Sequence, residues 1–299
     1  MSNNDIPVSL DAVMPPGMAA KAEDLGVKKA SLPFVNMFIL AVLAGAFIAV
    51  GAIFSTTVGA GSISVKDAAG AAAFSTGLPY GVTRLLMGIV FAVGLILVVV
   101  GGSELFTGNN LIIMAFASKK ISLGALLRNW VVVYLGNFVG SIITAYIVFL
   151  SKQYTFGSGA VGLTALNIGE AKTNFTFIQA VALGTMCNAL VCMAVWLCYS
   201  ARTTTDKILS IIPPIACFVA AGFEHSIANM YFIPIALFIK YWGEPNFFET
   251  IGKTLADFPH LTWGNFFVVN LLPVTIGNII GGAFMVGLVY WFVYLRKKA

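Results

Sequence analysis

Charged residues are scarce in this chain. Only 10% of its 299 residues are Asp, Glu, Lys or Arg, whereas 59% are hydrophobic. Soluble domains carry about 25% charged residues, so this chain has too few to cover a water-facing surface. The mean hydropathy of +0.92 agrees with that conclusion. The sequence therefore predicts an integral membrane protein that contacts the lipid bilayer. Its net charge of +5 forms no basic patch that would bind nucleic acid.

Metal ligands and reactive side chains are scarce as well. The chain has two histidines and four cysteines, and no pair among them has the spacing of a metal site. The cysteines fall in or beside apolar runs, where we expect them to be small core residues. No nucleophile triad or cofactor motif is present. We therefore expect no metal, no cofactor and no enzymatic activity, which argues against a membrane enzyme.

Six stretches are apolar enough to cross a bilayer, for which a helix needs about 20 mostly apolar residues. The predicted spans are 32–58, 82–100 continued by 111–117, 131–150, 175–199, 208–222 together with 227–239, and 266–295. The two parts of the fifth span are too short to cross alone, so we interpret them as one interrupted crossing. The sequence thus predicts an all-α membrane protein with six transmembrane helices, the second and fifth of them broken.

Basic residues are unevenly divided between the two sides of such a protein. If both chain ends lie on the same side, that side carries 11 Lys and Arg residues and the other carries six. The richer side holds Lys21, Lys28, Lys29, Lys119, Lys120, Arg128, Arg202, Lys207, Arg296, Lys297 and Lys298. The positive-inside rule then predicts that both termini are cytoplasmic.

The segment before the first span differs from the rest in composition. Residues 18–30 mix Ala, Lys, Glu and Leu and are typical of a short amphipathic helix. We expect residues 1–31 to form a cytoplasmic N-terminal segment and residues 32–299 to form the transport domain. The helix is either an interfacial anchor or a gating element.

Both interrupted spans are broken by the same pattern. Glu104 precedes Asn109 by five residues in the second span, and Glu224 precedes Asn229 by five residues in the fifth. An ionisable group at membrane depth is energetically costly and is therefore a candidate for function. Matching breaks in the two halves of a membrane chain point to a transport site.

A second pattern also occurs once in each half. The motif Gly-Asn-x-x-Gly at 136–140 returns at 277–281. Its glycines allow helices to pack closely. Three spans separate equivalent positions, and an odd number reverses the orientation. The sequence therefore predicts a 3+3 inverted repeat of about 32–151 and 173–296.

Broken helices free backbone N–H and C=O groups that lipid cannot satisfy. The polar side chains near the breaks are predicted to brace these groups: Glu104, Asn109, Asn137, Glu224, Asn229 and Asn278. For the two glutamates, a proton relay is the alternative role. The free N-termini of the half-helices carry partial positive charge and attract an anion to the middle of the membrane.

Thr107 from one break and His225 from the other would line the path of that anion. His225 is the only histidine at membrane depth, which favours a functional role over that of a hydrogen-bonded core histidine. The Thr107 hydroxyl can donate to a carboxylate or nitrite oxygen. Its alternative is a local bond to a carbonyl one turn earlier in the chain.

Four motifs together resemble the formate–nitrite transporter family, and the resemblance runs from residue 18 to about 296. The motifs are Glu-Leu-Phe-Thr at 104–107, Leu-Gly-Asn at 135–137, Gly-Phe-Glu-His-Ser-Ile-Ala-Asn-Met at 222–230 and Pro-Val-Thr-Ile-Gly-Asn-Ile-Ile-Gly-Gly at 273–282. The third motif is the most specific. The resemblance implies an aquaporin-like protomer, a homopentamer in a bacterial or archaeal cytoplasmic membrane, and one anion pore per protomer.

The resemblance also implies roles for particular residues. The central polar pair of the family matches Thr107 and His225. Its apolar constrictions match Phe91, Leu95, Leu105 and Phe218, its polar pore residues match Asn188 and Asn278, and its basic residue on the outer approach matches Lys172. A solvated loop lysine is the alternative for Lys172.

The expected substrate is formate or a similar small monovalent anion, moved by a passive channel or a proton-coupled facilitator. The run Thr-Gly-Asn-Asn at 107–110 is more similar to nitrite and hydrosulfide branches, whereas Phe-Ile-Pro at 232–234 is more similar to formate transporters. Nitrite and hydrosulfide therefore stay open as substrates. A neutral-solute pore of aquaporin type is disfavoured, because the chain lacks paired Asn-Pro-Ala motifs and has a histidine in the middle of the pore.

Overall fold

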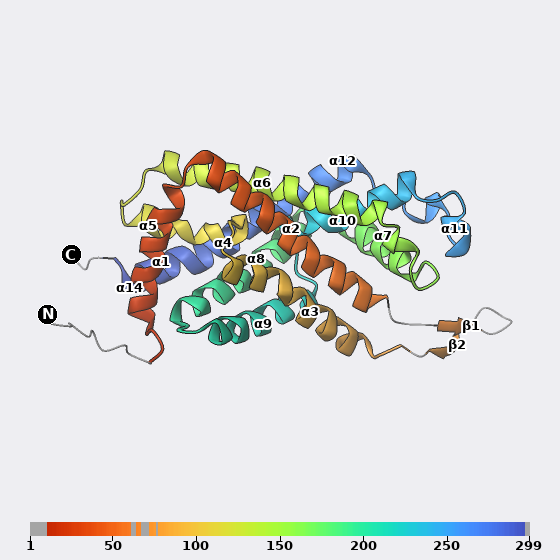
Figure 1. Ribbon diagram of the computed structural model, residues 1–299, viewed down its shortest axis with the longest axis horizontal. Helices are drawn as coiled ribbons and strands as arrows, with labels where there is room; N and C mark the ends of the chain where they lie inside the picture. The colour runs from red at the N-terminus through yellow and green to blue at the C-terminus, as the bar shows by residue number, and fades with distance from the viewer. Residues whose placement is uncertain (1–10, 61–63, 67–71, 76, 297–299) are drawn as a thin grey trace, which may run out of the picture.

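The computed structural model describes residues 11–60, 64–66, 72–75 and 77–296. Residues 1–10 of the predicted N-terminal segment, and Lys297 and Lys298 of the predicted basic cluster, lie outside the described residues. The molecule is elongated, with its long helices running between two ends (Figure 1). The first and last described helices, α1 (Pro15–Ala30) and α14 (Val289–Tyr294), lie at the same end.

Six helical stretches in the described part of the chain are long and apolar enough to cross a membrane. They are α2 (Phe34–Gly59), α3 (Tyr80–Gly101), α6 (Leu123–Leu150), α8 (Phe177–Ser200), α9 (Thr204–Ala221) and the continuous stretch Trp263–Tyr294. The last consists of α12 (Trp263–Asn265), the π-helical η4 (Phe266–Leu271), α13 (Leu272–Ile279), the π-helical η5 (Ile280–Leu288) and α14. The predicted multi-pass membrane protein is therefore confirmed.

The second and fifth spans are broken, as predicted. After α3 the chain resumes with α4 (Phe106–Asn109), the 3-10 turn η1 (Asn110–Ile112) and α5 (Ile113–Ala117). After α9 it resumes with α10 (Ser226–Trp242). Each first half ends at a glycine in the left-handed region, Gly102 with φ +79° and Gly222 with φ +77°. Since a residue with a Cβ is strained there, these glycines end the two helices at matching places.

Several elements outside the spans were not predicted. A small antiparallel hairpin, β1 (Ser64–Lys66) with β2 (Ala72–Ser75), lies between α2 and α3, so the all-α prediction holds for the membrane region alone. A 13-residue helix, α7 (Ala160–Lys172), packs against α10 in a segment where no helix was expected. The short elements are η2 (Gln153–Thr155), α11 (Phe247–Thr250) and η3 (Leu255–Asp257).

Glycines bring the same pairs of helices together in each half. A Cβ placed on Gly140 of α6 would lie 2.0 Å from the Val42 carbonyl oxygen of α2. A Cβ on Gly281 would lie 2.0 Å from the Thr185 carbonyl oxygen of α8. Real Cβ atoms do not approach so closely, so both crossings require glycine. The packing role expected of the Gly-Asn-x-x-Gly motifs is confirmed.

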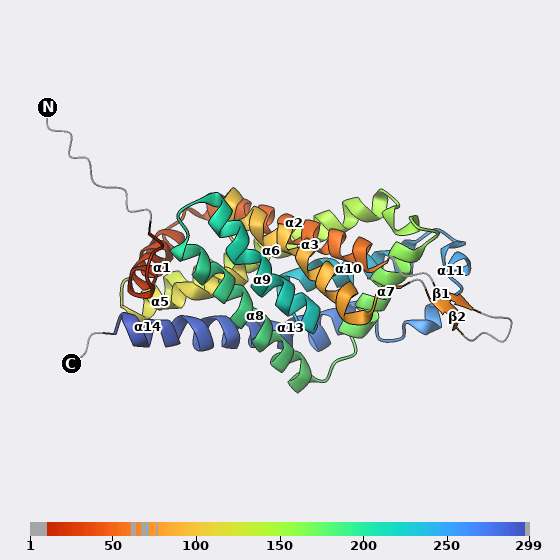
Figure 2. The ribbon, with the colours of Figure 1, turned by 90° about the horizontal axis from the view of Figure 1, so that it is seen from below.

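The helices α1 and α7 occupy equivalent places in the two halves. The predicted amphipathic helix at 18–30 is present as α1, which packs on α5, α8 and α14 through buried Met18, Ala19 and Ala22. In the other half, α7 packs on α10. The two helices lie toward opposite ends of the molecule (Figure 2). The helices α1 and α7 thus directly precede the predicted repeat boundaries at 32 and 173.

Candidate transport pore

In the described part of the chain, two cavities approach the helix breaks, and we name each after the helix outside the spans, α1 or α7, that lies in its wall. The α1 cavity has a volume of about 490 Å³ and is lined by residues of α1, α2, α3, α8, α9 and the break before α4. The α7 cavity has a volume of about 210 Å³ and is lined by residues of α2, α3, α7, α9, α10 and the break before α10. Each cavity therefore ends at one of the two helix breaks.

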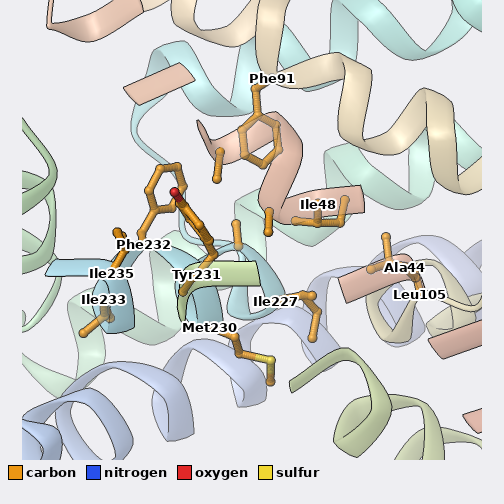
Figure 3. Close-up of a cluster of buried hydrophobic side chains, with 14 of the residues drawn as sticks. Ala44, Ile48, Phe91, Leu105, Ile227, Met230, Tyr231, Phe232, Ile233 and Ile235 are labelled. Atoms are coloured by element: carbon orange, nitrogen blue, oxygen red, sulfur yellow. The ribbon is translucent and has the colours of Figure 1, made fainter. Parts of the chain in front are cut away.

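The four predicted constriction residues are buried, each 2% exposed, and divide between these cavities. Leu95 and Leu105 line the α1 cavity, whereas Phe91 and Phe218 line the α7 cavity. The rings of Phe91 and Phe218 meet edge to face, with centroids 5.6 Å apart. Phe91 also stacks on Phe232, which was not predicted as a constriction residue (Figure 3). Apolar side chains therefore narrow both approaches to the middle of the protein.

Thr107 and His225 meet at that middle position. Thr107 Oγ1 lies 3.2 Å from His225 Nε2, and the two side chains are 0% and 3% exposed. His225 Nδ1 accepts the Ala228 N–H at 3.2 Å and so caps the N-terminus of α10. Because Nδ1 is an acceptor, the neutral imidazole carries its proton on Nε2 and donates it to Thr107 Oγ1.

This arrangement leaves the Thr107 hydroxyl hydrogen available. Among the described residues, Thr107 Oγ1 makes no hydrogen bond except the one with His225, so the expected alternative bond to a carbonyl one turn earlier is not formed. Several other threonines of the spans do make such a bond, for example Thr56 and Thr144. Thr107 can therefore donate to an oxygen atom of a small anion beside it.

The glutamate of the first break is held by two donors. Glu104 Oε1 lies 2.7 Å from Lys29 Nζ, and Glu104 Oε2 accepts from Asn109 Nδ2 at 2.7 Å. Asn109 Nδ2 also donates to Asn129 Oδ1 at 3.0 Å, and Asn129 Nδ2 donates to the Lys29 carbonyl at 3.1 Å. These contacts join α1, α4 and α6 around the break. Contacts of this kind are what the predicted bracing role requires.

The second break repeats the arrangement with different helices. Glu224 Oε1 lies 2.6 Å from Lys172 Nζ, and Glu224 Oε2 accepts from Asn229 Nδ2 at 2.7 Å. Asn229 Nδ2 donates to Asn270 Oδ1, and Asn270 Nδ2 donates to the Lys172 carbonyl, both at 2.8 Å. The two ion pairs line opposite cavities, which is the arrangement expected of an inverted repeat.

Asn137 and Asn278 support the backbone of the two breaks in the same way. Asn137 accepts from the Phe106 N–H and donates to the Ala41 and Glu104 carbonyls. Asn278 accepts from the Ser226 N–H and donates to the Gly184 and Glu224 carbonyls. Both amide hydrogens of each side chain are therefore used by backbone oxygens.

Asn188 and Asn278, expected from the resemblance as polar pore residues, are both engaged with backbone. Asn188 Nδ2 lies 2.7 Å from the Asn278 carbonyl and 3.3 Å from the Thr107 carbonyl, and it also contacts Asn110 Oδ1 at 3.0 Å. Neither asparagine is among the residues that line the two cavities. They thus position Thr107 and the breaks and have no amide hydrogen left for an anion.

Lys172 is less free than its predicted role on the outer approach suggests. Besides the Glu224 contact, its Nζ lies 5.4 Å from the centroid of the Phe232 ring, and its side chain is 15% exposed. It nevertheless lines the α7 cavity. Its counterpart Lys29 was not predicted as a site residue from the sequence, and neither were Asn129 and Asn270. Spacing from the two Glu-x4-Asn elements reveals none of the three, because they come from other helices.

The two polar groups at the centre are not equivalent in the repeat. The residue after Glu104 is Leu105, whereas the residue after Glu224 is His225. Likewise Thr107 corresponds to Ile227, which is fully buried in the apolar core (Figure 3). Each half therefore supplies one polar and one apolar side chain to the centre, although the braces around them are alike.

Two cavities that approach a buried polar pair from opposite ends, inside a six-span inverted repeat, define a membrane pore protein. The chain belongs to the formate/nitrite transporter family, whose model, "Formate/nitrite transporter", matches residues 16–292. The resemblance found in the sequence is thus confirmed, as is the expectation of a transporter and not an enzyme.

Three similar proteins illustrate the relationship. The formate channel FocA of Escherichia coli (strain K12) is 43% identical over 288 residues, which are 96% of each chain. The protein of the same name from Haemophilus influenzae is 39% identical over 288 residues, again 96% of each chain. A solved structure described as a pentameric formate channel with formate bound is 46% identical, with a TM-score of 0.79, and covers 88% of this chain and 98% of its own.

Proposed function

We propose that this protein is a formate pore: a passive channel or proton-coupled facilitator that assembles as a homopentamer with one pore in each protomer. The support comes from similar proteins that are named formate channels and from a similar structure described as pentameric with formate bound. The similarity extends over nearly the whole chain, so it includes both helix breaks and both cavities.

The observation that carries this proposal is the buried contact between Thr107 and His225. A bare monovalent anion that passes Leu and Phe side chains loses its hydration, at a cost of several kcal/mol. The Thr107 hydroxyl and the His225 imidazole are buried hydrogen-bonding groups between the apolar residues of the two cavities, where they can offset part of that cost. A formate ion has two acceptor oxygens, which can take hydrogen bonds from such groups.

Two routes past the constrictions are compatible with these groups. Formate can take up a proton and cross as neutral formic acid, or it can cross as an anion beside a transiently charged His225. The contact between His225 Nδ1 and the Ala228 N–H supports a neutral resting imidazole, since a second proton on Nδ1 would face another donor. We therefore propose that charging of His225 is transient and requires this cap to open.

The distribution of basic residues supports an orientation in which the α1 cavity faces the cytoplasm. In this orientation Lys119 and Lys120, which follow α5, are cytoplasmic, whereas Lys152 and Lys253 are on the outer side. We propose a bacterial or archaeal cytoplasmic membrane as the location. Lys172 would then attract anions to the outer mouth, although its charge is shared with Glu224.

Flux measurements on the purified protein test the proposal. Proteoliposomes are assayed for uptake of formate, nitrite and hydrosulfide at several pH values, with empty liposomes as the control. We expect formate to enter much faster than in empty liposomes and faster than the other two. Faster nitrite or hydrosulfide uptake would reassign the substrate within the family. No uptake above empty liposomes would overturn the transport function.

A further inference from the structure

The α1 cavity contains more positive charge than its acidic groups balance. Four lysines line it: Lys21, Lys28 and Lys29 of α1 and Lys207 of α9. Its lining includes one carboxylate, Glu104, which is paired with Lys29. Within the residues that the structure describes, no ion pair is made by Lys21, Lys28 or Lys207; the Lys21 ammonium donates to the Tyr199 carbonyl. Three ammonium groups thus lack a carboxylate partner.

The excess positive charge of the α1 cavity is not repeated in the α7 cavity. In the α7 cavity, the position of Lys28 is taken by Ala171, which directly precedes Lys172 as Lys28 precedes Lys29. The position of Lys207 is taken by Met87, which stands as far before the first helix break as Lys207 stands before the second. The guanidinium of Arg84 also lines that cavity, but it donates to the Val219 and Ala220 carbonyls at the end of α9. The extra lysines are therefore particular to the larger cavity.

Lys21 and Lys207, from different helices, are close enough for their charges to act on each other. Lys21 lies in α1, outside the spans, and its pKa is lowered by burial and by the charges of Lys207 and Arg202. Like charges held together without a counter-charge are relieved by a bound anion. The electrostatic energy of an anion in the cavity is proportional to its charge. If the positive potential raises the local concentration of a monovalent anion by a given factor, it therefore raises that of a trivalent anion by the cube of that factor.

Size distinguishes such an anion from the transported one. The cavity of about 490 Å³ is far larger than a formate ion requires, and it ends at Leu95 and Leu105. Its wall also includes the apolar side chains of Leu25 and Val99. An organic anion with several carboxylates can occupy this space and contact lysines of both α1 and α9, but it is too large to pass the two leucines.

We propose that the α1 cavity is a binding site for di- and tricarboxylates, which obstruct the pore when they bind. The obstruction rests on the proposed formate function, whereas the binding does not. In the cytoplasmic orientation, such a site would reduce formate movement when multivalent organic acids accumulate on the α1 side.

Citrate is a suitable probe, because it is trivalent near pH 7.5, and gluconate is a monovalent organic anion of similar size. Formate flux is measured in proteoliposomes of known protein orientation, with either salt on the α1 side or on the α7 side at equal ionic strength. We expect inhibition by citrate on the α1 side, and much less inhibition by gluconate or by citrate on the other side.

Variants connect the effect to the lysines. Lys21→Gln combined with Lys207→Met should raise the citrate concentration for half inhibition by roughly tenfold, since two partly exposed charges are lost. Lys253→Gln, at the other end of the molecule, is the matched control and should leave the citrate response unchanged. Titration calorimetry of citrate into the solubilised pentamer gives the same comparison without any flux.

The outcomes separate this proposal from the transport function. Formate flux without citrate inhibition, or equal inhibition by gluconate, would overturn the citrate site and leave the formate pore intact. Equal citrate sensitivity in the double lysine variant would also overturn it. If the protein moves no formate at all, the pore proposal fails, and calorimetry still decides whether citrate binds through Lys21 and Lys207.

Discussion

Removing the carboxylate of Glu104 should loosen the first helix break. Its two oxygens accept from Lys29 Nζ and Asn109 Nδ2, each at 2.7 Å. Glu104→Ala leaves both donors without this acceptor. At about 1–3 kcal/mol per unpaired group, the free energy of unfolding should fall by about 2–6 kcal/mol. The Lys29 side chain is 30% exposed and can be partly rehydrated, so we expect the lower part of this range.

The change to glutamine distinguishes the contacts further. Glu104→Gln keeps the shape of the side chain but replaces one of the two acceptor oxygens by an NH2 donor. That NH2 group must face either Lys29 or Asn109, both of which are donors. We expect a loss of stability between those of the wild type and Glu104→Ala. Adding Lys29→Met removes the opposing ammonium and should recover much of that loss. The equivalent pair at the second break, Glu224→Gln with Lys172→Met, should behave in the same way.

Thermal unfolding of the solubilised protein, followed by tryptophan fluorescence, and the pentamer fraction in size-exclusion chromatography provide the measurements. A Glu104→Ala variant as stable as the wild type would refute the bracing role. So would a double variant no more stable than Glu104→Gln alone. A stable Glu104→Gln pentamer whose formate uptake no longer responds to pH would instead support the proton relay.

Three further predictions concern packing, selectivity and charge. Gly140→Ala should lower the unfolding temperature more than Gly102→Ala, because its Cβ would lie 2.0 Å from a backbone oxygen, whereas a Cβ on Gly102 meets open space and causes only the strain of its positive φ; equal shifts would contradict the close helix crossing. Phe91→Ala should raise the ratio of acetate to formate uptake by opening the constriction, and an unchanged ratio would remove Phe91 from the size filter. Lys172→Gln should slow formate influx more at low salt than at high salt, since charges are screened over about 10 Å at 0.1 M; equal slowing at both would argue against steering.

The helix breaks could be predicted from the sequence because their signals are local. Each break combines a glycine, a glutamate and an asparagine within eight residues of an otherwise apolar run. Lipid cannot satisfy freed backbone groups, so polar side chains must gather wherever a helix is interrupted inside the membrane. The placement of Thr107 and His225 near each other followed from the repeat, since each belongs to one break.

The partners of the braces could not be predicted, because they depend on packing between distant segments. In the sequence, Lys29 is one more basic residue of an amphipathic helix. Asn129 follows Arg128 just before the predicted third span, and Asn270 lies within the apolar sixth span. The helix α7 has a mixed composition that resembles a loop, and its position becomes apparent only when it covers α10. The asparagines at 188 and 278 were assigned to the pore by resemblance, and only the structure shows that their amides serve the backbone.

We propose that formate crosses this protein at the contact between Thr107 and His225. Uptake of radiolabelled formate into proteoliposomes, measured side by side for the wild type and His225→Phe with the pentamer verified for each, tests it most directly. We expect rapid proton-linked uptake by the wild type and its loss in the variant. Equal uptake by a correctly assembled His225→Phe pentamer would contradict it.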